Sequence, residues 1–448
     1  MAVKFTPSRV LVGLLALAVL CVFAAWLATA VFGSRGGDRT QTLAPGPTRE
    51  LIARGAYLAT VGDCAACHTA AGGKPLAGGL AIATPVGVVY SSNVTPDQAT
   101  GIGRYSLGDF ERAVRRGIRP DGSTLYPAMP FPSYARTSDP DIAALYAYFM
   151  NGVAPVAQVD RKADIPWPLS LDWPLTWWRW AFAPSVPAAL PAAGGALLAR
   201  GAYLVEGLGH CGACHTPRGY AFEEKALTDA GGPAYLSGAR VDRYFASNLR
   251  GDDRNGLGRF SEEDVIRLLQ AGRNSGTAVF GAMADVVSHS TQFMRLEDLR
   301  AIAHYLKSLP PSGAGGGFAY DATAAAALSS GNASTRGSLD YLNNCAACHQ
   351  SSGKGYAETF PALAGNPVVN SADPSSLIDI VLNGATMPPT GQAPTSFAMP
   401  PFRERVSDEQ VSDVLTFIRS SWGNKAPAVD AAAVARLRRA TTANGPTR

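Results

Sequence analysis

The chain has 448 residues, of which 47% are hydrophobic and 17% are charged. This length and apolar content exclude a disordered chain and exceed what one small core requires, so we expect two to four domains. The net charge is only +4, and beyond the N-terminus the basic residues gather only in a short patch, Arg436, Arg438 and Arg439. Nucleic acid is therefore not an expected partner.

Residues 1–35 are predicted to be a signal peptide or an N-terminal membrane anchor. Lys4 and Arg9 precede Val10–Ser34, a run of 25 residues without a charge. At about 1.5 Å per residue, such a helix can span a hydrocarbon core of about 30 Å, and the basic residues before it predict that the rest of the chain is exported. The length favours a retained anchor, and cleavage after Ala28–Ala30 is the alternative.

Six of the seven cysteines fall in three copies of one pattern, Cys-x-x-Cys-His. The copies are Cys64-Ala-Ala-Cys67-His68, Cys211-Gly-Ala-Cys214-His215 and Cys345-Ala-Ala-Cys348-His349. Chance would give on the order of a thousandth of one match, and the pattern is the attachment signature of c-type haem. A structural zinc site usually needs two paired half-sites, and a redox dithiol gives no reason for the histidine, so both explanations fit less well.

The spacing suits covalent haem attachment. Two thiols three positions apart lie one above the other on a turn of helix, so both can form thioethers at one haem edge. The histidine that follows can offer an imidazole nitrogen to the iron as the proximal ligand. The sequence therefore predicts three haem c groups, with His68, His215 and His349 on the irons.

An internal repeat marks the units that carry these motifs. Arg54–Leu58 before the first motif has the same sequence, Arg-Gly-Ala-Tyr-Leu, as Arg200–Leu204 before the second. Further on, Ser106 with Asp109 and Ser261 with Asp264 predict capped helix starts in the first two units, and the corresponding helix of the third unit starts at Ser375. The predicted helices begin at Ser106, Ser261 and Ser375 and end at Gly117, Gly272 and Gly384.

A last helix is predicted to close each unit, because apolar residues recur there at helical spacing. These helices are Ser138–Asn151, Arg295–Leu309 and Ser407–Trp422. The fold class is therefore all-α, with three tandem cytochrome c domains after an N-terminal apolar segment.

A methionine opposite the histidine would close the sixth position of the iron and raise its reduction potential, as suits electron transfer. Met129 lies twelve residues beyond Gly117, and Met283 lies eleven residues beyond Gly272. The matching distances predict Met129 and Met283 as the axial ligands of the first two haems.

The third unit offers two candidates for the axial ligand. Met387 lies three residues beyond Gly384, whereas Met399 lies fifteen residues beyond it. Met399 also stands in Ala-Met-Pro, as Met129 does. The repeat therefore favours Met399 over Met387.

The predicted parts of the chain follow in order. They are the N-terminal segment 1–35, the first cytochrome c domain 49–154, a Pro/Trp-rich linker 155–195, the second domain 196–309, a Gly/Ala/Ser-rich linker 310–335, the third domain 336–424 and a C-terminal tail 425–448. The first linker holds Trp167, Trp173, Trp177, Trp178 and Trp180. These tryptophans are predicted either to pack between haem domains or to form a docking surface for another subunit.

Several segments resemble the tri-haem cytochrome c subunit of membrane-bound periplasmic dehydrogenases. Besides the three motifs in order, they are Asp164-Ile-Pro-Trp-Pro168, Phe360–Asn366, Ala398-Met-Pro400 and Leu415–Arg419. The similarity covers about Arg49 to Asn424. It implies the six cysteines and three histidines above, with Met129, Met283 and Met399, as the haem-binding residues.

The resemblance also implies partners. Such a subunit takes electrons from a quinoprotein, flavoprotein or molybdenum dehydrogenase that oxidises an alcohol, sugar, sugar acid or aldehyde. It passes them to ubiquinone or the respiratory chain, up to a terminal oxidase, on the periplasmic side of the bacterial inner membrane. It would be anchored there by its N-terminal segment or by its partner.

No catalytic residue is predicted, because three units of about a hundred residues use up the chain and leave no room for a catalytic cofactor domain. Two other functions use the same haem chemistry. A multi-haem peroxidase would need one iron without a sixth ligand, although each unit has a methionine candidate. A c-type subunit of a terminal oxidase shares the haem chemistry but suits the repeat and the Trp-rich linker less well.

Overall fold

The computed structural model describes residues 20, 22–24, 26–27, 46–185, 195–313 and 316–443. Its contacts divide the chain into two compact units, Met1–Gly55 with Ala70–Ala188, and Ala56–Thr69 with Ala189–Arg448. The predicted second and third domains thus share one unit. Most of the predicted segment 1–35 lies outside the described residues, among which no helix has the length and apolar character to span a bilayer.

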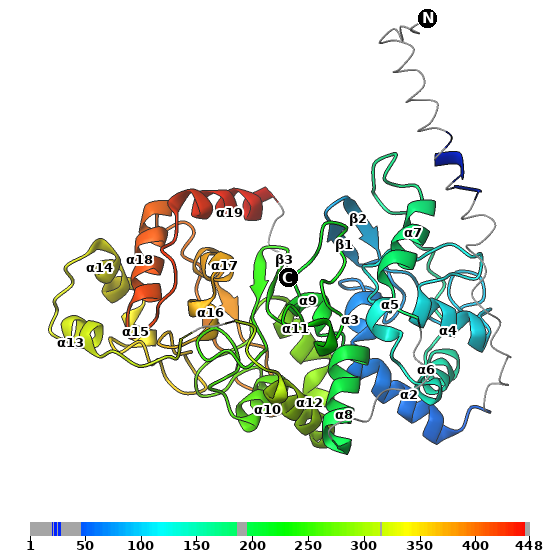
Figure 1. The fold of residues 1–448 in the computed structure, drawn as a ribbon, viewed down its shortest axis with the longest axis horizontal. Helices are drawn as coiled ribbons and strands as arrows, with labels where there is room; N and C mark the ends of the chain where they lie inside the picture. The colour runs from blue at the N-terminus through cyan, green and yellow to red at the C-terminus, as the bar shows by residue number, and fades with distance from the viewer. Residues whose placement is uncertain are drawn as a thin grey trace, which may run out of the picture. The chain divides into compact units, whose positions relative to one another are not determined.

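Helices are the main regular secondary structure of the described residues (Figure 1). The first part contains α2 (Arg49–Val61), α3 (Cys64–His68), β1 (Ala81–Thr84), β2 (Gly87–Tyr90), α4 (Leu107–Arg116), α5 (Phe131–Tyr134), α6 (Asp139–Asn151) and α7 (Trp173–Phe182). The middle part contains α8 (Ala196–Tyr203), η1 (Leu204–Leu208), α9 (Gly212–His215), η2 (Asp229–Gly231), β3 (Ala239–Val241), β4 (Tyr244–Ala246), α10 (Glu262–Ala271), α11 (Ala282–His289), η3 (Thr291–Phe293) and α12 (Leu296–Ser308). The last part contains α13 (Thr323–Ser329), α14 (Arg336–Asn344), α15 (Ala346–His349), α16 (Pro367–Asn370), α17 (Ser375–Asn383), β5 (Ala385–Thr386), β6 (Ala398–Met399), α18 (Asp408–Ser420) and α19 (Ala431–Ala443).

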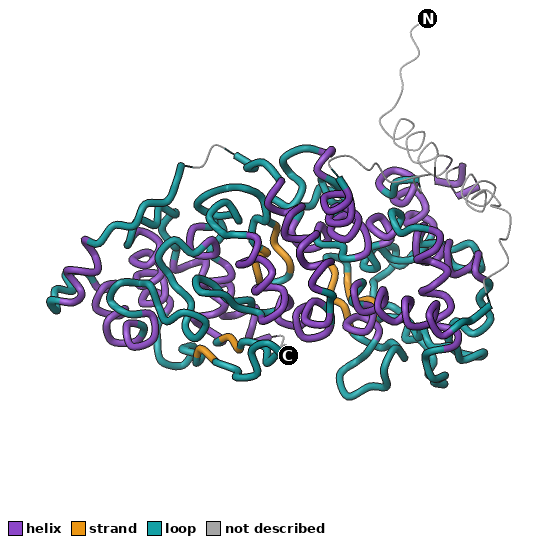
Figure 2. Tube along the Cα trace, turned by 90° about the horizontal axis from the view of Figure 1, so that it is seen from below, coloured by secondary structure: helices purple, strands orange, loops and turns teal. Residues whose placement is uncertain are grey.

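The all-α prediction holds for the helices but misses three short antiparallel ribbons (Figure 2). They pair β1 with β2, β3 with β4, and β5 with β6. None of these strands exceeds four residues, which is too short for an alternating hydrophobic pattern to stand out.

The predicted helix starts and ends are confirmed in the first two units. Ser106 and Ser261 each accept a hydrogen bond from the N–H three residues later, and the aspartate there bonds back to the serine N–H. Gly117 and Gly272 follow these helices with φ of 62° and 69°, the left-handed conformation that favours glycine. In the third unit α17 ends before Gly384, which also has a positive φ.

The two segments after the second domain carry more structure than their composition predicts. The Gly/Ala/Ser-rich stretch 310–335 contains α13, and Leu328 on this helix is buried in the core of the third domain. The tail 425–448 contains α19, whose Val434 is fully buried in the same core. Apolar residues of α19 are therefore used inside the protein.

A glycine on the first helix of each predicted domain lies against the last helix of that domain. An added Cβ would fall inside 3.0 Å of a backbone carbonyl oxygen of the last helix, a distance that real Cβ atoms essentially never show. The pairs are Gly55 with Ala144, Gly201 with Ala301, and Gly337 with Asp413. The first two glycines come from the Arg-Gly-Ala-Tyr-Leu repeat, whereas Gly337 was not aligned with them from the sequence.

An arginine beside the glycine strengthens the first two of these crossings. Arg54 pairs with Asp141 at 2.6 Å, and Arg200 pairs with Asp298 at 2.7 Å. Both carboxylates lie in the first turn of the last helix, and both aspartates are buried. Burial raises the pKa of Asp298, but the hydrogen bonds from Arg200 and Tyr57 outweigh it and hold this pKa below its ordinary value.

We predict that Gly337→Ala destabilises the protein by about 1–3 kcal/mol, because the new methyl group overlaps the carbonyl of Asp413 and only a backbone shift can relieve it. Gly391→Ala is the matched control, since Gly391 is exposed and a Cβ there meets nothing within 4 Å. Urea unfolding of the full chain, followed by circular dichroism, measures both. Equal stability of the two variants would contradict a close crossing at Gly337.

Candidate haem sites

Each Cys-x-x-Cys-His motif occupies one short helical turn, as the spacing predicts. α3 covers the whole first motif, and α9 and α15 begin one residue after Cys211 and Cys345. The N–H groups of His215 and His349 donate to the carbonyls of these cysteines at 3.0 Å and 2.9 Å. Both cysteines and the histidine of each motif thus lie within one turn.

The imidazoles of the second and third motifs are held by backbone carbonyls. His215 Nδ1 lies 2.7 Å from the oxygen of Ser247, and His349 Nδ1 lies 2.9 Å from the oxygen of Pro361. A carbonyl oxygen only accepts, so Nδ1 carries the proton and Nε2 keeps its lone pair for a metal. Burial lowers the pKa of both histidines, although the hydrogen bond opposes this, and favours the neutral ring that an iron ligand requires.

The six motif cysteines form no disulfide with any described residue. Burial raises the pKa of Cys64, Cys211 and Cys345 to about 12 and that of Cys67 to about 11. Redox-active dithiols and zinc thiolates have lowered values instead. Burial therefore keeps these four thiols protonated at neutral pH, unlike the thiols of a redox-active dithiol.

An apolar cavity of about 210 Å³ lies at the third motif. Its wall contains Cys345, Cys348, His349, Met387 and Met399, and most of the remaining lining is aliphatic or aromatic. Thiols, an imidazole and thioethers around one apolar space are the groups that a covalently attached haem requires. The residues of this cavity fit haem c.

Both methionines of the third unit face this cavity. Ala385 on β5 pairs with Met399 on β6, and the Met387 N–H donates to Phe397 at 2.9 Å. Residues two apart on a strand share a face, so Met387 and Met399 lie on the same side of the hairpin. The structure thus brings His349 together with both candidates.

The other two methionines lie in different local structures. Met283 is on the first turn of α11, whereas the alignment placed it in a loop. Met129 precedes α5 and belongs to the first unit, while α3 with His68 belongs to the second unit. The pairing of Met283 with His215, and of Met129 with His68, stays a prediction.

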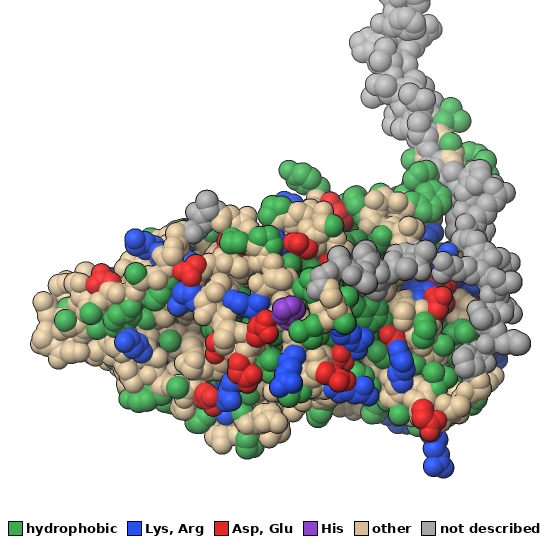
Figure 3. All heavy atoms as spheres, turned by 60° about the horizontal axis from the view of Figure 1, so that its bottom comes forward, with side chains coloured by type: hydrophobic (Ala, Val, Ile, Leu, Met, Phe, Trp, Pro, Cys, Tyr) green, Lys and Arg blue, Asp and Glu red, His purple; other side chains and the backbone are tan. Residues whose placement is uncertain are grey.

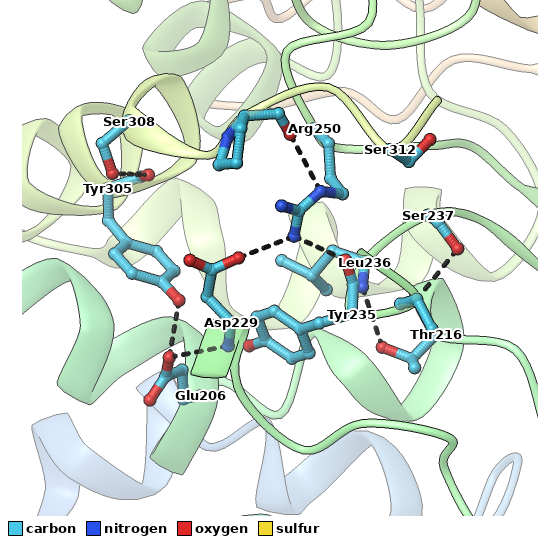
Figure 4. A network of polar contacts seen from close by, with 12 residues as sticks. Glu206, Thr216, Asp229, Tyr235, Leu236, Ser237, Arg250, Tyr305, Ser308 and Ser312 are labelled. Carbon is cyan, nitrogen blue, oxygen red and sulfur yellow. Dashed lines mark hydrogen bonds and ion pairs between the residues drawn. The ribbon is translucent and has the colours of Figure 1, made fainter. Parts of the chain in front are cut away.

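Arg250 is a buried arginine that connects several loops of the second domain (Figure 4). The sequence motifs did not indicate it. The Arg250 side chain is only 2% exposed. It donates to the Asp229 carboxylate at 2.8 Å, to the carbonyl of Tyr235 at 3.1 Å and to that of Pro310 at 2.9 Å. These bonds tie three separate loops together, so the arginine fixes the segment around the second motif.

The same network reaches the second motif itself. The Leu236 N–H donates to Thr216 Oγ1 at 3.0 Å, and the Gly238 N–H donates to the carbonyl of His215 at 2.8 Å. Tyr305 on α12 donates to the buried Glu206 at 2.6 Å (Figure 4). The helical turn that ends at His215 is therefore hydrogen-bonded to the loop around Leu236 and Gly238.

A sequence signal for this loop was available. Ser92–Asp97 and Ser247–Asp252 share the pattern Ser-Asn-x-x-x-Asp before the Gly-x-Gly repeat. In both, the asparagine Oδ1 accepts from the N–H two residues later, at 3.0 Å in the first and 2.8 Å in the second. This repeat would have extended the alignment of the first two units.

A helical cysteine pair, an imidazole held by a carbonyl and an apolar cavity lined by thioethers define a c-type cytochrome domain. The family model for cytochrome c matches residues 334–422, which contain the third motif and both methionines of its cavity. Haem c with its iron is therefore the cofactor of this domain.

Relatives cover most of the chain. It is 53% identical to the cytochrome c subunit of the quinone alcohol dehydrogenase of Gluconacetobacter polyoxogenes, over 88% of this chain and 85% of that protein. It is 55% identical to the gluconate 2-dehydrogenase cytochrome c subunit of Pantoea cypripedii, over 88% and 90%. It is 36% identical to the fructose dehydrogenase cytochrome subunit of Gluconobacter japonicus, over 89% and 86%. The chain belongs to the family of cytochrome c subunits of alcohol, gluconate and fructose dehydrogenases, which confirms the resemblance.

We predict that Met399→Ala removes the thioether-to-iron signature of the third haem and lowers its reduction potential, because water or a weaker ligand replaces the sulfur. Met387→Ala is the control and should leave the signature in place. The near-infrared charge-transfer band of the oxidised protein measures both, with a fall from three equivalents to two in the first variant alone. The reverse outcome would show that the repeat misassigned the third ligand.

Proposed function

We propose that this chain is a three-haem electron-transfer subunit that carries electrons from a periplasmic dehydrogenase to ubiquinone or the respiratory chain. Three Cys-x-x-Cys-His motifs, each folded as one helical turn, are the observation that carries the proposal. The haem-binding residues would be the six motif cysteines, and the axial pairs would be His68 with Met129, His215 with Met283, and His349 with Met399.

Haem iron supplies reversible one-electron transfer. The residues of this chain would supply the rest: the cysteines fix the haem edge, and the carbonyls of Ser247 and Pro361 hold two imidazoles in one orientation. The apolar lining of the third cavity would exclude water from a bound haem and so favour a raised reduction potential. Such fixed surroundings suit electron transfer, because little has to move when the charge changes.

The substrate chemistry would belong to a partner. The relatives are subunits of dehydrogenases that are named for an alcohol, gluconate and fructose. We infer that the partner of this chain is likewise a catalytic dehydrogenase that oxidises an alcohol, sugar, sugar acid or aldehyde, with a quinone, flavin or molybdenum cofactor. Attachment to the periplasmic side of the inner membrane would come from the N-terminal segment or from this partner.

The haem count is the first test. Pyridine haemochrome assays of the denatured chain should return three c-type haems, and none should be lost to acidic acetone, because thioether bonds survive unfolding. Cys345→Ala/Cys348→Ala should lower the count to two, as should the same double change in either other motif. A count of two in the unchanged protein would refute the three-haem proposal.

The Trp-rich linker supplies a candidate docking surface for the partner. Trp167 is 80% exposed, and Trp177 and Trp180 on α7 are each 40% exposed. The last two stack edge to face, with ring centroids 5.0 Å apart. Leu169 is also exposed. Exposed aromatic groups of this kind commonly anchor protein interfaces.

The other face of α7 packs onto its own unit. Trp178 meets Phe131 edge to face, with centroids 6.0 Å apart, and Thr176 shares a hydrogen bond with Thr124 at 3.1 Å. The linker tryptophans thus divide into a packed group and an outward group. The outward group, Trp167, Trp177 and Trp180, is the surface that we assign to docking.

Substitution can separate the two groups. Trp177→Ser/Trp180→Ser should leave the melting temperature unchanged but weaken binding of the dehydrogenase by about 2 kcal/mol or more, roughly 30-fold in Kd. Trp178→Ala is the control, and it should lower the melting temperature because it removes buried packing. Pull-down of the dehydrogenase beside thermal unfolding measures both effects, and full binding by the double variant would exclude this surface.

The face drawn in Figure 3 gives no comparable electrostatic signal, because basic and acidic side chains are interspersed on it. This agrees with the small net charge of +4. Steering by one large patch of a single charge is therefore no part of the proposal for this face.

A further inference from the structure

The third haem cavity is not built by the third domain alone. Thr277, Ala278, Val279 and Phe280 of the second domain line it. Asn366, which also lines it, donates to Thr277 Oγ1 at 3.2 Å. The segment after α10 therefore forms part of the cavity wall, beside the β5–β6 hairpin that contains Met387 and Met399.

Arg273 begins this segment and is the residue that reaches the hairpin. It is 6% exposed, and its Nη1 donates to the carbonyl of Thr395 at 2.8 Å and to Met387 Sδ at 3.7 Å. Its guanidinium carbon lies 5.1 Å from the centroid of the Phe397 ring. All three contacts lie on the loop that joins β5 to β6.

The backbone beside Arg273 also contacts the hairpin closely. A Cβ on Gly272 would come to 2.9 Å from Pro388 Cγ, and the φ of 69° at Gly272 excludes an easy replacement. The start of the arginine side chain is therefore fixed relative to Met387.

The two methionine sulfurs differ in their surroundings. Met387 Sδ accepts from a buried cation, whereas the described chain shows no hydrogen bond to Met399 Sδ in the same cavity. The Nε of Arg273 is buried without a partner among the described residues, whereas Nη1 would keep its bond to the Thr395 carbonyl if the sulfur contact were lost. A nearby positive charge also draws electron density from the sulfur and makes it a poorer donor to iron.

We propose that Arg273 is a positioning residue that holds Met387 away from the iron of the third haem and so leaves Met399 as its axial ligand. This inference rests on the proposed function, because it concerns the coordination of the third predicted haem. Its consequence is that Met387 is a competent ligand, restrained by a residue of the neighbouring domain.

The test replaces Arg273 in a variant that already lacks Met399. In Met399→Ala the third thioether band should be missing. In Met399→Ala/Arg273→Leu it should return in most molecules, because the freed Met387 binds the iron. Adding Met387→Ala should remove it again. Loss of a merely structural residue would not restore a ligand signature.

Arg267→Leu in the Met399→Ala background is the matched control. Arg267 lies on α10 of the same domain and pairs with Glu358 in the third domain, but no contact with Met387 is among its interactions. The band should stay absent in this variant. A band in Met399→Ala with Arg273 present, or none in the double variant with three haems bound, would overturn the inference.

A second measurement covers poor folding of the double variant. Arg273→Leu alone, labelled with methyl-¹³C methionine, should show in its reduced form a fourth ring-current-shifted methyl signal that Met387→Ala removes. Three unchanged signals would refute the role of Arg273. The pyridine haemochrome count on each sample separates this failure from failure of the three-haem proposal, which would show as fewer than three haems in the unchanged chain.

Discussion

The close contact between the first and last helix of each predicted domain is the constraint on which the rest of the structure depends. Gly55, Gly201 and Gly337 let the helices approach until only a hydrogen atom fits between one backbone and the carbonyl of the other. The Cys-x-x-Cys-His turn follows the first helix closely in the sequence, although η1 lies between them in the second domain. The helix crossing is therefore near each motif along the chain.

Sequence patterns predicted the parts of each site that depend on local chemistry. The motif spacing gave the helical turn, and serine with aspartate three residues later gave the starts of α4 and α10, because capping involves only neighbouring residues. The family match confirms the class of protein that these motifs indicated. What the sequence could not give was the partner of each group across the fold, such as the carbonyl of Ser247 for His215.

The methionines show where repeat alignment reaches its limit. Met129 and Met283 stand at nearly equal distances from the preceding glycine, yet one lies before α5 and the other within α11. The four-residue Ala-Met-Pro-Pro segment of the third unit places Met399 on β6. Spacing conserves the path length of the chain but not its local conformation, which tertiary packing decides. Arg250 lies inside the Ser-Asn-x-x-x-Asp repeat but at one of its variable positions, so the repeat does not mark the arginine itself.

The second and third domains behave as one unit because their contact is polar, buried and specific. Arg243 pairs with Asp379, which is fully buried, at 3.3 Å, and the Phe245 N–H donates to Ser376 at 2.8 Å. Substitution of Arg243 would therefore leave the buried Asp379 carboxylate without its cation. Residues 277–280 of the second domain also form part of the wall of the third cavity. It follows that the third site is properly studied in the whole chain, since residues 334–422 alone would expose one side of its cavity and release the hairpin from Arg273.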